Sequence, residues 1–235
     1  MNDYNSLAYP LAAESQPDER AKFISRTYAH LAVAVLAFVA LEWVLLNSSV
    51  APVMMRAMGN GRMGWMIIFL GFMGVTWLAR WMADRHASTG MQYAGLALYT
   101  VAEAVIFLPI LFVATRYARA DVVPIAAAIT GALFLGLTAV AFTTKKDFSF
   151  LGAILKVAGF VALGVMVASM IFGFQLGLLF AAVMVLFAAG SILYDTSNIM
   201  HRYSTRQHVA ASLSLFASVM LLFWYILRLV MGRRD

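Results

Sequence analysis

The chain has 235 residues, of which 63% are hydrophobic and 12% are charged, and its formal net charge is +6. Soluble domains contain about 45–50% apolar and about 25% charged residues, so too few polar side chains remain here to cover a water-soluble globule. The composition therefore predicts a membrane protein, and the absence of cysteine excludes disulfide frameworks, thiolate nucleophiles and thiolate metal sites.

The chain begins with a polar stretch in which acidic and basic residues are mixed, "MNDYNSLAYPLAAESQPDERAKF". A cleaved signal peptide has a positively charged leader directly before a short apolar core, and this stretch has neither. We therefore expect residues 1–24 to form a flexible cytoplasmic tail, and residues 25–235 to form a single membrane domain with short loops.

Seven apolar segments follow the tail, each near the length of about 20 residues that a helix needs to cross about 30 Å of hydrocarbon. Lipid cannot satisfy the backbone groups of open strands, and the alternation typical of a spanning barrel is absent. The predicted fold is therefore all-α with seven transmembrane helices. The expected spans are 27–47, 64–83, 92–114, 122–142, 152–173, 176–195 and 209–230.

The basic residues occur mostly in pairs near the ends of these segments, which is typical of membrane loops rather than of a nucleic-acid surface. With the N-terminus inside, more of them fall on the cytoplasmic side than outside. The inside set is Arg20, Lys22, Arg26, Arg80, Arg85, Lys145, Lys146, Arg202 and Arg206. This bias favours a cytoplasmic N-terminus and a C-terminus on the opposite side.

Three acids fall within the expected spans: Glu42, Glu103 and Asp195. A charge at the bilayer centre costs at least a few kcal/mol, so such residues are expected to face protein or water. Glu42 lies near the outer end of its span, where it is able simply to reach the interface. Glu103 lies one helical turn after Tyr99, and a hydrogen bond between them suits either a packing role or a functional one.

Several polar groups share the helix face of Asp195. Ser191 lies four residues before it, Asn198 lies three residues after it, and Arg202 follows. Burial disfavours a charged carboxylate, whereas a nearby cation or amide donor favours it, so this group is a candidate pH sensor. The alternative is an acid at a helix end that only pairs with an arginine.

Other chemistries lack support in the sequence. The histidines His30, His86, His201 and His208 form no HExxH pair and no His/Cys cluster, so no zinc motif is present. Neither a serine with a neighbouring membrane histidine nor a glycine-rich phosphate loop occurs. We expect the protein not to be an enzyme and to need no cofactor.

Three stretches resemble conserved blocks of the Bax inhibitor-1/YccA family of seven-helix membrane proteins. They are "LYDTSNIMHR" at 193–202, "TTKKDFSFLGAIL" at 143–155 and "SLSLFASVMLLFWYILRLV" at 212–230. A fainter likeness extends to "YTVAEAVIFLPIL" at 99–111. The resemblance covers the membrane domain and implies that the last helix is packed among the other six.

The resemblance also implies a role for Asp195. In the family, two acids on the last two helices form a hydrogen-bonded pair that senses pH, and some members are pH-dependent calcium leaks. The first acid corresponds to Asp195 and the second to Ser218, so this chain lacks one carboxylate of a coupled, calcium-ligating pair. Calcium would then be a transported ion in contact with Asp195, and an arginine partner of the acids would be Arg80 or Arg85.

Ser218 and the ending "MGRRD" resemble the YccA branch, whose bacterial members are inner-membrane proteins that bind and restrain the membrane protease FtsH. The resemblance therefore implies a modulator of membrane proteolysis or stress survival in a bacterial inner membrane, with the lipid bilayer and an FtsH-type protease as partners. The alternative is a proton- or calcium-linked leak channel gated around Asp195, Ser218 and Glu103.

Overall fold

The computed structural model describes residues 11–59, 62–83, 88–144 and 146–232. In these ranges the chain forms helices and no strand, and an isolated bridge pairs Leu11 with Ser204. The all-α prediction is therefore confirmed for the described residues. The helices are α1 (Pro17–Leu46), α2 (Val50–Gly59), α3 (Arg62–Met82), α4 (Thr89–Tyr117), α5 (Val122–Thr144), α6 (Leu151–Phe172), α7 (Leu178–His201) and α8 (His208–Gly232).

Six of the described helices, α1 and α4 to α8, are long and apolar enough to cross a membrane. In α3 the apolar part is shorter, Met66–Met82, so the expected number of seven spans is met only if this helix also crosses. The ten-residue α2 was not anticipated from the sequence, which placed its residues in a loop. The structure thus supports a multi-pass membrane protein with six clear spans.

The first helix begins earlier than the expected span at residue 27. Pro17 lies in the first turn of α1, where its missing N–H costs nothing, and Asp18 and Glu19 complement the positive end of the helix dipole. Residues 17–24, expected in the tail, are therefore helical. Helix α7 also differs from its expected span, because it continues to His201, six residues beyond the expected end at Asp195.

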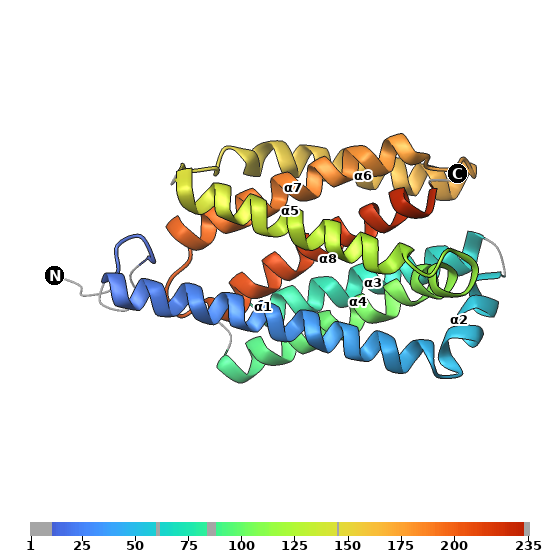
Figure 1. The fold of residues 1–235 in the computed structure, drawn as a ribbon, viewed down its shortest axis with the longest axis horizontal. Coiled ribbons are helices and arrows are strands. Elements are labelled where there is room, and N and C mark those ends of the chain that lie inside the picture. The colour runs from blue at the N-terminus through green and yellow to red at the C-terminus, as the bar shows by residue number, and fades with distance from the viewer. Residues whose placement is uncertain (1–10, 60–61, 84–87, 145, 233–235) are drawn as a thin grey trace.

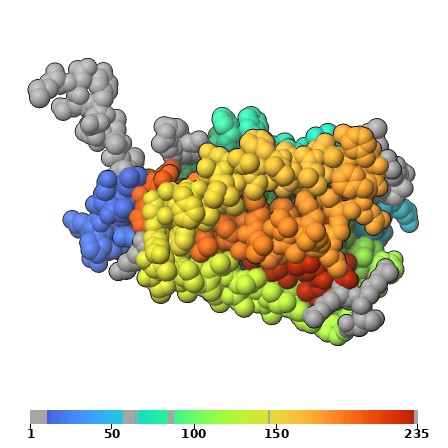
Figure 2. Space-filling view, turned by 90° about the horizontal axis from the view of Figure 1, so that it is seen from above, coloured from blue at the N-terminus to red at the C-terminus, as the bar shows by residue number. Residues whose placement is uncertain are grey.

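The long helices lie roughly along one axis, parallel or antiparallel to one another, and α1 and α8 both begin toward the left end of Figure 1. Helix α8 contacts α1, α4, α5 and α7. In the most apolar stretch of α8, 61% of the residues are buried inside the protein, against 6% in that of α6. Figure 2 shows α6 and α7 covering one face of the bundle, with a strip of α8 between α7 and α5. The exposed side chains of Phe160 and Leu179 are those expected of a surface that meets lipid.

Aromatic rings join α1, α4 and α8 in the core. The ring of Phe38 lies edge-on to Phe107, with centroids 5.2 Å apart, and to Phe216, with centroids 6.5 Å apart. Edge-to-face packing of this kind adds to the stabilisation from burial. These contacts fix α4 against α8, and so fix the positions of the polar side chains that the two helices carry.

Gly95 allows α3 to approach α4 closely. A Cβ atom at this position would lie 2.6 Å from the carbonyl oxygen of Ala79, which is too close for any side chain. The next residue of α3 after Ala79 is Arg80, and one turn after Gly95 on α4 is Tyr99. The close helix crossing therefore places Arg80 beside Tyr99.

The loop between α7 and α8 is held by hydrogen bonds on both sides. The amide of Ala12 donates to the carbonyl of Tyr203 at 2.8 Å, and the hydroxyls of Tyr203 and Ser214 are 3.2 Å apart. Burial raises the pKa of Tyr203. This short connection makes α7 and α8 antiparallel neighbours and brings Asp195 opposite Ser218.

Candidate functional site

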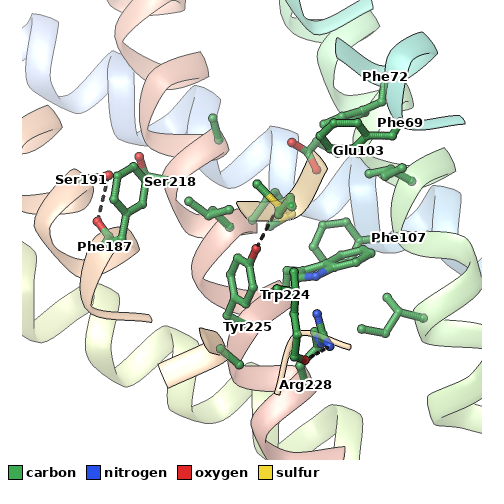
Figure 3. A pocket seen from close by; sticks show the side chains of 18 of the residues that line it. Phe69, Phe72, Glu103, Phe107, Phe187, Ser191, Ser218, Trp224, Tyr225 and Arg228 are labelled. Carbon is green, nitrogen blue, oxygen red and sulfur yellow. Dashed lines mark hydrogen bonds between the residues drawn. The ribbon is translucent and has the colours of Figure 1, made fainter. Parts of the chain in front are cut away.

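A cavity of about 1210 Å³ lies among α3, α4, α6, α7 and α8. Much of its wall is aromatic or aliphatic, and Figure 3 shows Phe69, Phe72, Phe107 and Trp224 around it. A small number of polar side chains interrupt this lining. They are Arg80, Tyr99, Glu103, Lys156, Ser169, Gln175, Ser191, Tyr194, Asp195, Ser214, Ser218, Tyr225 and Arg228.

Asp195 and Ser218 meet across the α7–α8 contact. The Ser218 hydroxyl donates to Oδ2 of Asp195 at 2.6 Å, a distance within the range of strong hydrogen bonds to carboxylates. Ser218 is buried and Asp195 is partly buried, and both line the cavity. Ser218, which was expected opposite Asp195 from the sequence resemblance, is therefore its direct hydrogen-bond partner.

Glu103 and Tyr99 form a second polar group on α4. Both side chains are buried and lie one helical turn apart on the same face of α4. The guanidinium carbon of Arg80 lies 5.7 Å from the centre of the Tyr99 ring, within the range of a cation–π interaction. Arg80 lines the same cavity as Glu103 and Asp195.

The other expected partners of Asp195 are placed differently. The Ser191 hydroxyl donates to the Phe187 carbonyl of its own helix at 3.0 Å. The side-chain oxygen of Asn198 is buried and has no hydrogen-bond partner among the described residues. Arg85 lies outside the described residues, so of the two candidate arginines the structure places only Arg80.

Glu42 is separate from this cavity. Its side chain is 4% exposed on α1, and neither carboxylate oxygen has a hydrogen-bond partner within the described ranges. The idea that Glu42 reaches the interface does not fit this burial, since the helix turns the neighbouring Trp43 outward instead. A buried polar group without a partner costs free energy, so Glu42 differs in kind from Asp195.

Metal ligands are sparse. In the parts of the chain that the structure describes, no group of three or more His, Cys, Asp or Glu side chains comes together. Calcium prefers six to eight oxygen ligands, and Asp195 with Ser218 supplies only a few. A calcium ion at Asp195 would therefore keep most of its water, as a passing ion does.

Comparison with known proteins identifies the family. Residues 20–235 match the family model described as "Inhibitor of apoptosis-promoting Bax1". The chain belongs to the Bax inhibitor-1 family. It is also similar to uncharacterized proteins of two Neisseria meningitidis strains, serogroup A and serogroup B. Each is 29% identical over 178 residues, which covers 75% of this chain and 76% of the relative.

The site residues predicted from the sequence of this Bax inhibitor-1 family member did not include Arg228. Arg228 on α8 lines the cavity and donates to the carbonyl of Leu176 at 3.0 Å. In Figure 3 it lies well away from Ser218 and Glu103. An arginine inside the apolar stretch "YILRLV" was itself a signal, because intramembrane cations face protein or water.

Proposed function

We propose that Asp195 controls a proton- or calcium-linked leak through the cavity among α3, α4, α6, α7 and α8. The observation that carries this proposal is the hydrogen bond from Ser218 to Asp195 on the cavity wall. The hydrogen bond holds α7 against α8 at one point of the polar lining. A change in the protonation of Asp195 alters that bond, and with it the contact between the two helices.

The charges along the cavity support the same proposal. Glu103 and Asp195 supply hard oxygens, whereas Arg80 and Arg228 supply positive charge. Arg80 lines the cavity with both acids, so we expect its positive charge to oppose the entry of another cation. Protonation or movement of one acid changes this balance, which is how a polar path in an apolar wall is opened and closed.

Flux measurements on reconstituted vesicles that hold a calcium dye test the proposal. We expect a leak whose rate depends on pH, and we expect Asp195→Asn to remove that dependence. Glu42→Gln is the matched control, because Glu42 is a buried acid outside the cavity. A leak that ignores both pH and Asp195→Asn, or the absence of any leak, would count against this function.

We further propose that the membrane topology has seven crossings, with α3 as the additional span and α8 as the central helix. The α8 contacts with four other helices and its burial support this arrangement. The positive-inside bias supports a cytoplasmic N-terminus in a bacterial inner membrane. Because the chain has no cysteine, single Asn47→Cys and Ser88→Cys variants, at the end of α1 before α3 and at the start of α4 after it, can be labelled with an impermeant maleimide. Labelling of both positions from the same side would contradict this topology.

A second candidate function is modulation of an FtsH-type membrane protease. It is supported by Ser218, which the resemblance connects with the YccA branch, and by the exposed, charged start of α1, including Asp18 and Glu19. Such a segment suits a protease that engages polar termini. Purification in mild detergent is expected to recover the protease with this chain, and repeated failure to do so would reject this candidate.

A further inference from the structure

Two histidines and a tyrosine from three helices converge near the end of the bundle where α4 and α8 begin. Nε2 of His30 on α1 is 2.9 Å from the hydroxyl of Tyr93 on α4. Nε2 of His208 on α8 is 3.4 Å from the same hydroxyl. The two imidazole rings have their centroids 5.0 Å apart. Two imidazole nitrogens, which are the commonest metal ligands in proteins, and one phenol oxygen therefore face one another.

The first imidazole is already in the form that a metal requires. Nδ1 of His30 lies 2.6 Å from the carbonyl oxygen of Arg26. A carbonyl only accepts hydrogen bonds, so Nδ1 carries the proton and Nε2 of the neutral ring keeps its lone pair. Metal-binding histidines are oriented in this way, with the second ring nitrogen donating to a backbone carbonyl.

The hydrogen bonds of the second imidazole are incomplete. Nδ1 of His208 is buried and has no partner among the described residues. Tyr93 has a single hydroxyl proton, so it donates to only one of the two Nε2 atoms. A cation between the rings would bind the lone pairs of both Nε2 atoms, and the proton of His208 would then lie on Nδ1.

The separations of the two Nε2 atoms from the Tyr93 hydroxyl also suit a tetrahedral ion. Zinc binds histidine nitrogen at about 2.0–2.1 Å, so neighbouring ligand atoms in a tetrahedron lie about 3.3 Å apart. The separations of 2.9 and 3.4 Å lie on either side of that value. We propose that His30, His208 and Tyr93 form a site for a divalent transition-metal ion such as Zn²⁺, with water as the fourth ligand.

The surroundings set the strength and the consequence of this site. Tyr93 is 40% exposed and both histidines are only partly buried, so an ion has access from water. Arg26 acts electrostatically on His208, and this positive charge opposes the binding of a cation. We therefore expect modest affinity, and a bound ion would fasten α8 to α1 and α4.

Titration of Zn²⁺ into the purified full chain, freed of any affinity tag, tests the site by competition with a zinc dye. We expect one ion per chain and at least tenfold weaker binding in His30→Gln and in His208→Gln. His201→Gln is the matched control, because Nδ1 of His201 also meets a backbone carbonyl, that of Ser197, without a second histidine. Arg26→Gln keeps the carbonyl that orients His30 and is expected to tighten binding.

A measurement on the unaltered protein covers the case in which a variant does not fold. Co²⁺ bound to this site should give the intense visible absorption of a tetrahedral complex, and Zn²⁺ should displace it. Absence of zinc binding, or affinity unchanged in both histidine variants, would overturn the proposal. An octahedral cobalt spectrum in the wild-type protein would also overturn it.

Discussion

The cavity wall and the outer part of α1 both bury acids, but they treat them differently. On the cavity wall Asp195 accepts a hydrogen bond from Ser218, and Glu103 lies one helical turn from Tyr99. On α1, Glu42 has both carboxylate oxygens buried and unpartnered among the described residues. The acids of the cavity are thus held in defined positions, whereas burial of Glu42 costs free energy that no hydrogen bond offsets.

This difference separates two kinds of intramembrane acid that a sequence shows alike. A partnered acid next to a cavity gains or loses specific hydrogen bonds when its protonation changes. An acid packed among apolar groups has no such partners to exchange. The stability of variants at these positions therefore measures whether the distinction is real.

The largest expected effect comes from placing a second acid opposite Asp195 with Ser218→Asp. Two carboxylates would replace the 2.6 Å hydrogen bond, and they would have to share a proton. Two like charges 4 Å apart repel by about 4 kcal/mol at an effective dielectric constant of 20. The variant should lose stability as pH rises and both groups ionise. Unfolding by dodecyl sulfate in mixed micelles at several pH values would measure this.

The wild-type protein is the control for that experiment, with a shallower dependence of unfolding free energy on pH. The vesicle leak of Ser218→Asp should also depend more steeply on pH than the wild-type leak. Equal slopes for the two proteins would show that position 218 is not coupled to Asp195.

The next effect in size is expected for Ser218→Ala. This change removes the donor to Asp195 and leaves the carboxylate oxygen unsatisfied, at a cost of about 1.5–3 kcal/mol. Ser191→Ala is the matched control, because the Ser191 hydroxyl only donates to the carbonyl of its own helix. Unfolding free energies in mixed micelles would compare them, and an equal loss in both variants would contradict the special place of Ser218.

The sequence predicted the fold class and the acid Asp195, but it did not predict which side chains meet, and the reason is physical. The apolar segments predicted an all-helical membrane protein because lipid permits few other folds, and Asp195 was notable as a charge in such a segment. The pairing with Ser218 needed a family resemblance, because residues on two helices meet through tertiary packing. The His30, Tyr93 and His208 cluster lacked any local motif for the same reason, and α2 lacked the length of a span.

A smaller loss is expected for Tyr99→Phe. The change removes a buried hydroxyl one turn from Glu103 on α4 but keeps the ring beside Arg80. A hydrogen bond from this hydroxyl to Glu103 would contribute about 1 kcal/mol, which sets the expected loss. Tyr117→Phe is the control, since Tyr117 is 77% exposed and its change should stay within about 0.5 kcal/mol. Equal stability of Tyr99→Phe and the wild type would show that the Glu103 group is not held by this contact.

The smallest effect, and the one of opposite sign, is expected for Glu42→Gln. No hydrogen bond is lost, because neither oxygen has a partner in the described structure, and an amide is less costly to bury than a carboxylate. Unfolding free energy should stay the same or rise by up to about 1 kcal/mol. Glu103→Gln is the matched comparison, and it should lose stability because a neutral amide gives up the attraction of the carboxylate to Arg80 on the same cavity wall. A loss for Glu42→Gln as large as that for Glu103→Gln would mean that α1 holds its acid as firmly as the cavity wall does.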